Sequence, residues 1–352
     1  MQQNKTFNNF LDLEKSNLGT LTHFKLSHYF YQNIDVEDFI KLKSYLIQCT
    51  ELVSLILILT KKKIQDEGIK LLFEDLPVFK NLNTLQLILR QNKIEQKGAI
   101  YIAQYLKMCK NLTELQLNLN INNIDQIGIS QLVDAINTLD KIQNLQFWIG
   151  ENGIGDQGLS SIVLGLNNMK NLTQLGFYSF CNNISDAGAS AIGACLQTYP
   201  HLTSFKLSLI ENNIGDQGIS EIALGLSKLK NLKNLSLMLD INPFGDIGIS
   251  KIAAGLSNCT QITSIIFSSL EIDITNEGYQ NLDKCFSQLE QLVYFECWFG
   301  KNEKLLKSKD ILNCKNIKVL TIKFGYDILK IQRTQHLIQA LKIKRLVKMN
   351  LN

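Results

Sequence analysis

The chain has 352 residues, of which 45% are hydrophobic and 19% are charged. This composition is typical of a folded domain and argues against disorder, and no run of 18 apolar residues predicts a membrane-spanning helix. The formal net charge is +4, but residues 301–352 hold 13 Lys or Arg and three acidic residues, so residues 1–300 carry a net charge of −6. The basic C-terminal end could contact an acidic partner, or it could be a solvated capping helix.

The charge pattern disfavours nucleic-acid binding, which needs a basic surface with aromatic side chains for base stacking. Residues 1–300 are net acidic, and the chain holds three arginines, Arg90, Arg333 and Arg345. The first residues lack the apolar segment of a secretory signal, and the eight cysteines lack a paired spacing. These features predict a chain in a reducing compartment, which we expect to be the cytoplasm.

One unit recurs along the sequence at a step of 30 residues. A triplet of apolar residues follows this step, for example Leu82, Leu85 and Leu87. Glycine keeps the same step at Gly68, Gly98, Gly128, Gly158, Gly188, Gly218, Gly248 and Gly278. A strict period in this range indicates stacked repeats, each of which buries its apolar face against its neighbours. We therefore predict an α/β solenoid that forms one domain.

The N-terminal segment, residues 1–20, is predicted to cap the open end of the stack. Its apolar residues are spaced for a short amphipathic helix and are Phe7, Phe10, Leu11 and Leu13. Regular repeats are predicted over residues 21–291, followed by irregular repeats and a basic C-terminal cap over residues 292–352. The repeat starts predict twelve parallel strands, the first at Leu21 and the last at Leu346.

Each regular repeat reads as a strand, a loop and a helix. Leu115, Leu117 and Leu119 alternate with polar residues, which predicts a strand with one buried face. The loop asparagine can bond the loop backbone, and stacked copies could bond one another, at Asn92, Asn122, Asn152, Asn182, Asn212 and Asn242. An aspartate stands where the N-cap of the following helix is expected, at Asp66, Asp156, Asp186, Asp216 and Asp246. The repeat glycine two residues later should let the helix start approach the adjacent turn.

These repeats resemble the leucine-rich repeat family, and within it the ribonuclease-inhibitor-like class, over residues 21–352. The resemblance implies a horseshoe in which parallel strands line the concave side and helices the convex side. In one departure, the asparagine stands five residues after the last strand leucine, as in Leu207 and Asn212, instead of three. Either the strand runs further or the loop bulges. These long Asn-rich repeats look like those in large families of unicellular eukaryotes, including ciliated ones, so the resemblance implies a cytoskeletal or ciliary complex as one setting.

Strand positions that alternate with the core leucines are predicted to form the concave face. Most of them are small or polar, but one column holds large side chains that we predict to bind a protein partner, because large aromatic anchors dominate many interfaces. The predicted partner-binding residues are Ile88, Trp148, Tyr178, Met238 and Trp298, with Tyr294 beside them. Trp148 and Tyr178 are expected on adjacent strands about 5 Å apart. In the alternative interpretation, the rings only cover the sheet.

No catalytic, metal or cofactor pattern is found in the sequence. The four histidines are scattered and have no Cys or acidic residue at metal-ligand spacing. Gly153, Gly155 and Gly158 match a dinucleotide-binding spacing, but neighbouring repeats hold Asn183 or Asn213 at the first of these positions, so the match belongs to the repeat. We predict a non-enzymatic protein-interaction scaffold without a cofactor.

A GTPase-activating protein is the alternative function. The chain is similar in length and repeat class to Ran GTPase-activating protein, whose active loops use Arg and Asn at strand ends. Arg90 and Asn92 occupy such a loop here. That family carries an acidic C-terminal tail, whereas this chain ends with a basic segment. The GTPase-activating alternative therefore depends on Arg90 and Asn92.

Overall fold

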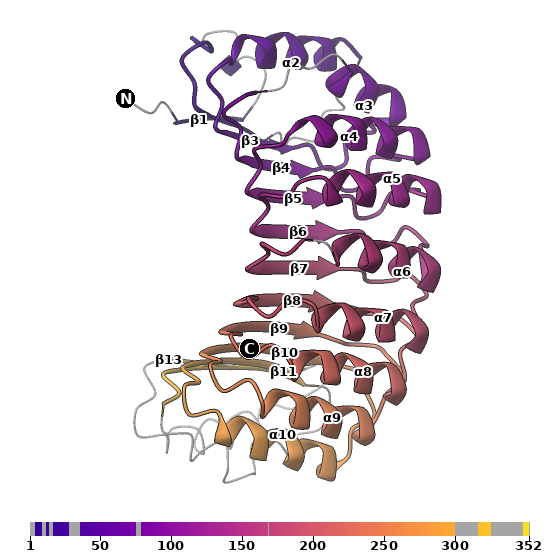
Figure 1. The fold of residues 1–352 in the computed structure, drawn as a ribbon, viewed down its shortest axis with the longest axis vertical. Coiled ribbons are helices and arrows are strands. Elements are labelled where there is room, and N and C mark those ends of the chain that lie inside the picture. The colour runs from indigo at the N-terminus through magenta and orange to yellow at the C-terminus, as the bar shows by residue number, and fades with distance from the viewer. Residues whose placement is uncertain are drawn as a thin grey trace. The chain divides into compact units, whose positions relative to one another are not determined.

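The computed structural model describes residues 4–8, 12–13, 17–27, 36–74, 79–167, 169–299, 316–324 and 348–351. The chain divides into two compact units, Met1–Leu172 and Thr173–Asn352. In each unit parallel strands follow one another in chain order and form a sheet, and the helices lie on one face of that sheet (Figure 1). Strand and helix alternate in every regular repeat, as the sequence period predicts.

The strands of the first unit are β1 (Asn4–Phe7), β2 (His23–Ser27), β3 (Ser54–Ile58), β4 (Thr84–Ile88), β5 (Glu114–Asn118) and β6 (Asn144–Trp148). Its helices are α2 (Val36–Gln48), α3 (Gln65–Phe73), α4 (Gln96–Met108), α5 (Gln126–Asn137) and α6 (Gly155–Leu166). Every adjacent pair of these strands is parallel.

The strands of the second unit are β7 (Gln174–Tyr178), β8 (Ser204–Ser208), β9 (Asn234–Met238), β10 (Ser264–Ser269), β11 (Tyr294–Phe299), β12 (Val319–Phe324) and β13 (Lys348–Leu351). Its helices are α7 (Asp186–Leu196), α8 (Asp216–Leu226), α9 (Asp246–Leu256) and α10 (Asn276–Gln288). The twelve predicted strands correspond to β2–β13 among the described residues.

The N-terminal segment differs from its prediction. Residues 4–7 form β1, which pairs in parallel with β2, where a helix containing Phe7 was expected. Phe7 is 2% exposed, and its ring lies 5.2 Å from the ring of Phe24. Packing against the first regular strand therefore overrides the helical spacing of this short segment. Leu13 is helical and buried as predicted, whereas Phe10 and Leu11 lie outside the described residues.

The strand ladder continues past the assigned strand ends. Leu89 follows β4 and is completely buried, and its N–H donates to the carbonyl of Asn118 at 2.8 Å. Two residues later the N–H of Gln91 donates to the carbonyl of Asn120 at 2.9 Å. Gln91 itself has a φ of 58°, which turns the chain out of the ladder. The long spacing before the asparagine is therefore an extension of the strand ladder. This was one of the two alternatives that the sequence left open, the other being a bulged loop.

Five loop asparagines tie their repeat to the preceding one: Asn92, Asn122, Asn152, Asn212 and Asn242. The Oδ1 of Asn122 accepts hydrogen bonds from the N–H groups of Asn92 and Ile94, both at 3.0 Å. Its Nδ2 donates to the carbonyls of Leu89 at 3.1 Å and Leu119 at 2.9 Å. The predicted bonding to the loop backbone is confirmed. Stacked copies meet through side chain and backbone: the side chain of one asparagine binds the N–H of another.

The column aspartates of the second unit have a different partner from the one predicted. Asp216 is the first residue of α8, and its Oδ1 accepts from the N–H groups of Gly245 at 2.8 Å and Gly248 at 2.7 Å, in the next repeat. Asp186 makes the equivalent bonds to the next repeat at 2.7 and 2.9 Å. The prediction that these aspartates cap their own helices is therefore wrong, because the unbonded N–H groups at the start of the following helix lie within their reach.

The repeat glycine makes this capping possible. A Cβ at Gly248 would lie 2.9 Å from the Oδ1 of Asp216 and 3.1 Å from a side-chain carbon of Ile219. Any larger residue would therefore push the helix start away from the carboxylate. The prediction that glycine permits close approach to the adjacent turn is confirmed.

The helices of the second unit also pack closely through small residues. A Cβ at Gly225 would lie 2.4 Å from the carbonyl oxygen of Gly193, and a Cβ at Gly255 would lie 2.4 Å from that of Ala223. The backbones of α7, α8 and α9 therefore meet almost directly.

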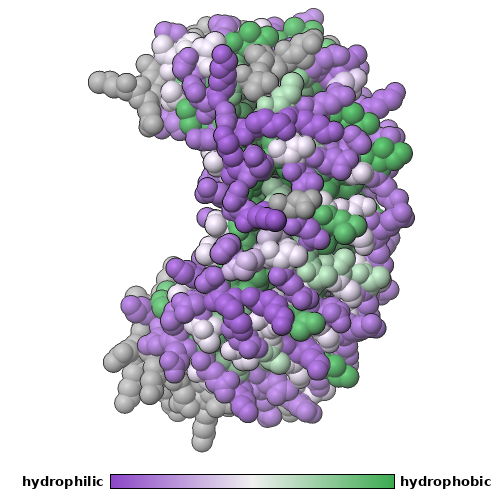
Figure 2. Space-filling model, viewed as in Figure 1, coloured by the Kyte–Doolittle hydropathy of each residue, from purple (hydrophilic) through white to green (hydrophobic). Residues whose placement is uncertain are grey.

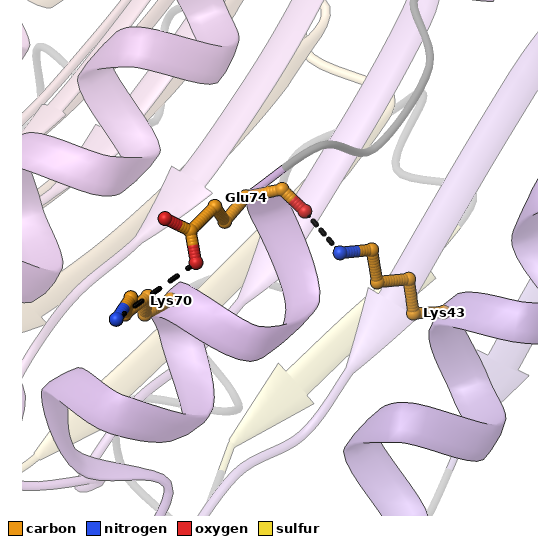
Figure 3. Close-up of polar contacts among 3 residues, drawn as sticks. All are labelled: Lys43, Lys70 and Glu74. Atoms are coloured by element: carbon orange, nitrogen blue, oxygen red, sulfur yellow. Dashed lines mark hydrogen bonds and ion pairs between the residues drawn. The ribbon is translucent and has the colours of Figure 1, made fainter.

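In the first unit, polar contacts connect α2 and α3 (Figure 3). Lys43 of α2 donates a hydrogen bond to the carbonyl of Glu74, which is the C-cap of α3. The Nζ of Lys70 lies 3.9 Å from the carboxylate of Glu74.

Candidate interaction surface

The face of each sheet away from the helices, here called the open face, carries the side chains at the first, third and fifth strand positions. In β4 these are Thr84, Gln86 and Ile88, which are half-buried, whereas Leu85 and Leu87 between them are completely buried. This alternation follows from the two-residue period of a strand. The open face is thus the surface on which every predicted partner-binding residue lies.

The fifth strand position of the second unit alternates between large and small side chains. Residues in register across β7 to β11 are Tyr178, Ser208, Met238, Ser268 and Trp298, here called the fifth-position row. Neighbouring strands are about 4.8 Å apart, so successive large side chains stand about 10 Å apart. The two serines are buried at 4% and 2% exposure, whereas the large residues stay half-buried. The large side chains therefore cover the serines and still present part of their surface.

The first unit carries the same alternation over three strands. Ile88, Asn118 and Trp148 are in register on β4, β5 and β6, and all three are half-buried. Trp148 belongs to the first unit and Tyr178 to the second, so their expected adjacency stays a prediction. Burial raises the pKa of Tyr178 to about 12, so its hydroxyl stays protonated at neutral pH.

Two predicted residues come together on β11, around a third that the sequence analysis did not select. The indole Nε1 of Trp298 donates to Oε1 of Glu296 at 2.8 Å, and the hydroxyl of Tyr294 donates to Oε2 at 2.5 Å. The hydrogen bond to Glu296, together with burial, raises the pKa of Tyr294 to about 12. The alternation Tyr-Phe-Glu-Cys-Trp was the available signal, because it places Glu296 between the two rings on one face.

A buried carboxylate lies two residues after Met238, the middle residue of the fifth-position row. Asp240 is 5% exposed and accepts hydrogen bonds from the Ser268 hydroxyl and from the N–H of Leu270 at 2.6 Å. Burial raises the pKa of Asp240, and the nearby charge of Glu271 acts in the same direction. This carboxylate holds two strands together and does not face a ligand space.

The loop that carries Arg90 does not favour the GTPase-activating alternative. Asn92 is completely buried; its Oδ1 accepts from the N–H of Lys62 at 2.7 Å, and its Nδ2 donates to the carbonyl of Leu59 at 2.7 Å. Its amide is therefore used to bind the preceding repeat. The nearby surface hollow, of about 770 Å³, has mixed charge and is lined mainly by Lys61, Lys63, Lys93, Glu95 and Glu151.

Among the described residues, no three His, Cys, Asp or Glu side chains group as metal ligands. The described part of the chain also contains no helix with the length and apolar character needed to cross a bilayer. Burial raises the pKa of Cys49, Cys109 and Cys285 to about 12, so these residues are protonated thiols at neutral pH. The buried cysteines thus pack as small hydrophobic side chains.

A family model described as Leucine Rich repeat matches residues 179–193 and 200–223, which run from the end of β7 through most of α8. The first segment covers the loop after β7 and most of α7, and the second covers β8, the loop after it and most of α8. The chain is built from leucine-rich repeats. Its assignment to the ribonuclease-inhibitor-like class stays a prediction.

No curated protein matches this leucine-rich repeat chain. Among solved structures, it is similar to a chain in the crystal structure of the Rad7 and Elc1 complex in yeast, with 14% sequence identity and a TM-score of 0.45. The match covers 93% of this chain and 79% of that chain.

The described helices of the leucine-rich repeat protein also expose some large apolar side chains. Figure 2 shows hydrophobic residues over the helices as separate patches among hydrophilic ones. Large apolar side chains that are mostly exposed on the described helices include Ile127, Leu164 and Ile247, at 56%, 68% and 62%. Isolated exposed apolar residues are common on soluble proteins and do not by themselves mark an interface.

Proposed function

We propose that this leucine-rich repeat protein is an interaction scaffold that binds a protein partner on the open face of its sheet. The supporting observation is the fifth-position row, in which Tyr178, Met238 and Trp298 stand half-buried on a face of mainly small and polar side chains. Tyr and Trp are enriched among the residues that dominate protein interfaces, because each buries a large area.

The mechanism is docking onto a preformed surface. The asparagine bonds and the extended ladder fix each strand relative to its neighbour, so the anchors need little ordering when a partner binds. Small polar residues at the first strand position of the open face, such as Ser204, Asn234 and Ser264, can supply hydrogen bonds that fix the orientation of the partner. The affinity would then depend on a few anchors, each worth about 1–4 kcal/mol.

The cellular setting is a second part of the proposal. The described cysteines are free, and six of the seven are buried, which suits a reducing compartment. We therefore propose the cytoplasm, and the resemblance of the repeats favours a cytoskeletal or ciliary complex. Imaging of the tagged protein in its native cell tests this setting directly.

A cross-linked capture experiment from the native cell tests the scaffold. Wild type is compared with Trp148→Ala/Tyr178→Ala, and the control is Leu164→Ala/Ile247→Ala, which removes two exposed helix side chains. We expect one partner to be retained by the wild type and the control and lost by the open-face variant. Circular dichroism and urea unfolding verify that all three fold. Equal capture by all three proteins would reject the open face as the binding surface.

A further inference from the structure

Lys206 is an exposed cation on the open face of the second unit. It is the third residue of β8, and its register partners are Gly176 on β7 and Ser236 on β9. Both partners are buried, whereas Lys206 is exposed. Because glycine and serine have little or no side chain, no bulky group of β7 or β9 stands level with the lysine. Among the described residues, the ammonium group of Lys206 makes no hydrogen bond or ion pair.

Helix dipoles account for other lysines of this unit but not for Lys206. Lys228 and Lys230 follow the C-terminus of α8, where the helix dipole favours positive charge. Lys206 lies within a strand, so it has no helix end to compensate. A contact with a group outside the chain explains its exposed position better.

Two exposed amides flank Lys206. Gln174 and Asn234 are the first residues of β7 and β9, one on each side of β8. Neighbouring strands are about 4.8 Å apart and two residues span about 6.6 Å, so the Cα of each lies about 8 Å from that of Lys206. In the part of the chain that the structure describes, neither amide side chain makes a hydrogen bond. We call Lys206, Gln174 and Asn234 the β8 donor patch.

The local charge of the β8 donor patch is positive. The described open-face positions of β7 to β10 hold no acidic residue, and Lys233 directly precedes β9. Glu296 is three strands away and accepts hydrogen bonds within β11, and Asp240 is buried and binds the backbone of Leu270. These two residues and Glu211 lie about 14 to 17 Å from Lys206 between Cα atoms. Salt largely screens charges at that separation.

The chemistry of the patch selects a singly charged anion. An ammonium group and amide N–H groups are hydrogen-bond donors that suit a carboxylate. One lysine balances one negative charge, so a carboxylate fits better than a phosphate, which carries nearly two. Tyr178 and Met238 lie two residues beyond Gly176 and Ser236 on the flanking strands, so an apolar residue next to the anion can contact them.

We infer that the β8 donor patch binds an aspartate or glutamate side chain of the protein partner. This inference rests on the proposed function, because it takes the open face as the docking surface. It adds the chemistry of one contact: an acidic side chain that bonds Lys206, with an apolar neighbour placed against Tyr178 or Met238.

A saturation-transfer NMR titration tests the patch without the native partner. The probe is a capped Leu-Glu-Leu peptide, and capped Leu-Gln-Leu and Leu-Lys-Leu differ from it only in the central side chain. We expect saturable binding of the glutamate peptide, at a dissociation constant on the order of millimolar. The glutamine and lysine peptides should bind at least about threefold more weakly, because they lose the ion pair with Lys206. The preference for glutamate should disappear in about 1 M salt.

Lys206→Met is the matched variant, because it keeps the apolar stem and removes the charge. It should bind the glutamate peptide at least about threefold more weakly, whereas Lys206→Arg keeps the charge and should bind within about twofold of the wild type. Lys228→Met is the control, since it removes an exposed lysine outside the open face, and it should bind as the wild type does. Circular dichroism verifies that every variant folds.

Three outcomes would overturn the inference: no saturable binding of the glutamate peptide, equal binding of the glutamine peptide, or unchanged binding by Lys206→Met. A loss in Lys228→Met as large as in Lys206→Met would indicate diffuse attraction to lysines and would overturn it too. Since no native partner is present, these failures reject the patch alone, whereas equal capture in the pull-down experiment rejects the scaffold.

Discussion

Asp240 and Asn120 occupy equivalent positions four repeats apart and make the same backbone bond. The Oδ1 of Asn120 accepts from the N–H of Gly150 at 2.6 Å, and the Oδ1 of Asp240 accepts from the N–H of Leu270 at 2.6 Å. One position thus accepts a neutral amide and a buried carboxylate. The difference between them is a negative charge that folding removes from water.

This comparison predicts that Asp240→Asn removes a pH-dependent term from stability. Burial raises the pKa of Asp240 in the folded state above its ordinary value of 3.8. The stability that protonated Asp240 contributes is fully present when the pH is below 3.8, and it is lost as the pH rises through the pKa of Asp240 in the folded state. The wild type should therefore lose stability relative to Asp240→Asn as the pH rises from about 3.8 through the raised folded-state pKa of Asp240.

Urea unfolding of both proteins at several pH values measures this difference. Asn120→Asp is the reciprocal variant and should introduce the same pH dependence in the first unit. A constant difference between wild type and Asp240→Asn at every pH would contradict the assignment.

At the scale of the element, helices α8, α9 and α10 begin where the preceding repeat supplies an acceptor. The N-caps of α8 and α9 are Gly215 and Gly245, which have no side chain that could make a capping bond. Asp186 and Asp216 supply that bond from one repeat earlier. The start of each of these helices is therefore a tertiary contact as well as a local feature of its sequence.

Asp216→Ala is expected to lower the free energy of unfolding by about 2 kcal/mol, because the N–H groups of Gly245 and Gly248 lose a charged acceptor. Urea unfolding measures this loss. Asp273→Ala removes an exposed carboxylate from a nearby loop and should change stability by less than about 0.5 kcal/mol. Equal effects of the two substitutions would show that the cap to the next repeat is not stabilising.

The order of strands and helices could be predicted from the sequence because its signals recur every 30 residues. The partner of the column aspartates could not be predicted. An aspartate at this position indicates a helix cap, but it does not indicate whether the aspartate caps its own helix or the helix of the next repeat. The contact of Gly225 with the α7 backbone could not be predicted either, because it also joins two different repeats. In the candidate site, Trp298 and Tyr294 were found by size. The alternation along β11 places Glu296 on the same face, but its hydrogen bonds to both rings depend on side-chain rotamers that spacing does not determine.

At the scale of the whole molecule, the buried cysteines report on opening of the fold. Cys195 and Cys259 are buried, and burial raises the pKa of each thiol to about 11. Cys181 is half-buried, and its Sγ lies 3.1 Å from Oε2 of Glu211. Only the thiolate reacts with alkylating reagents, so both burial and the raised pKa protect the first two residues.

We expect iodoacetamide to modify Cys181 faster than any other described cysteine in the native protein, by about tenfold or more. Peptide mass spectrometry over time measures each site, and Cys181→Ser should remove this fast reaction. In denaturant all described cysteines should react at similar rates. Labelling of Cys259 as fast as Cys181 under native conditions would contradict the packing described here.

The bonds between repeats have a consequence for how such a chain lengthens. Asn122 binds the backbone of the repeat before it, and Asp216 binds the backbone of the repeat after it. A tandem gene duplication that copies one whole period therefore brings along the donors and acceptors for both new junctions. Growth by copying needs no new compensating mutation at the seam, so selection could first fix the length of the protein and only later diversify the residues of its open face.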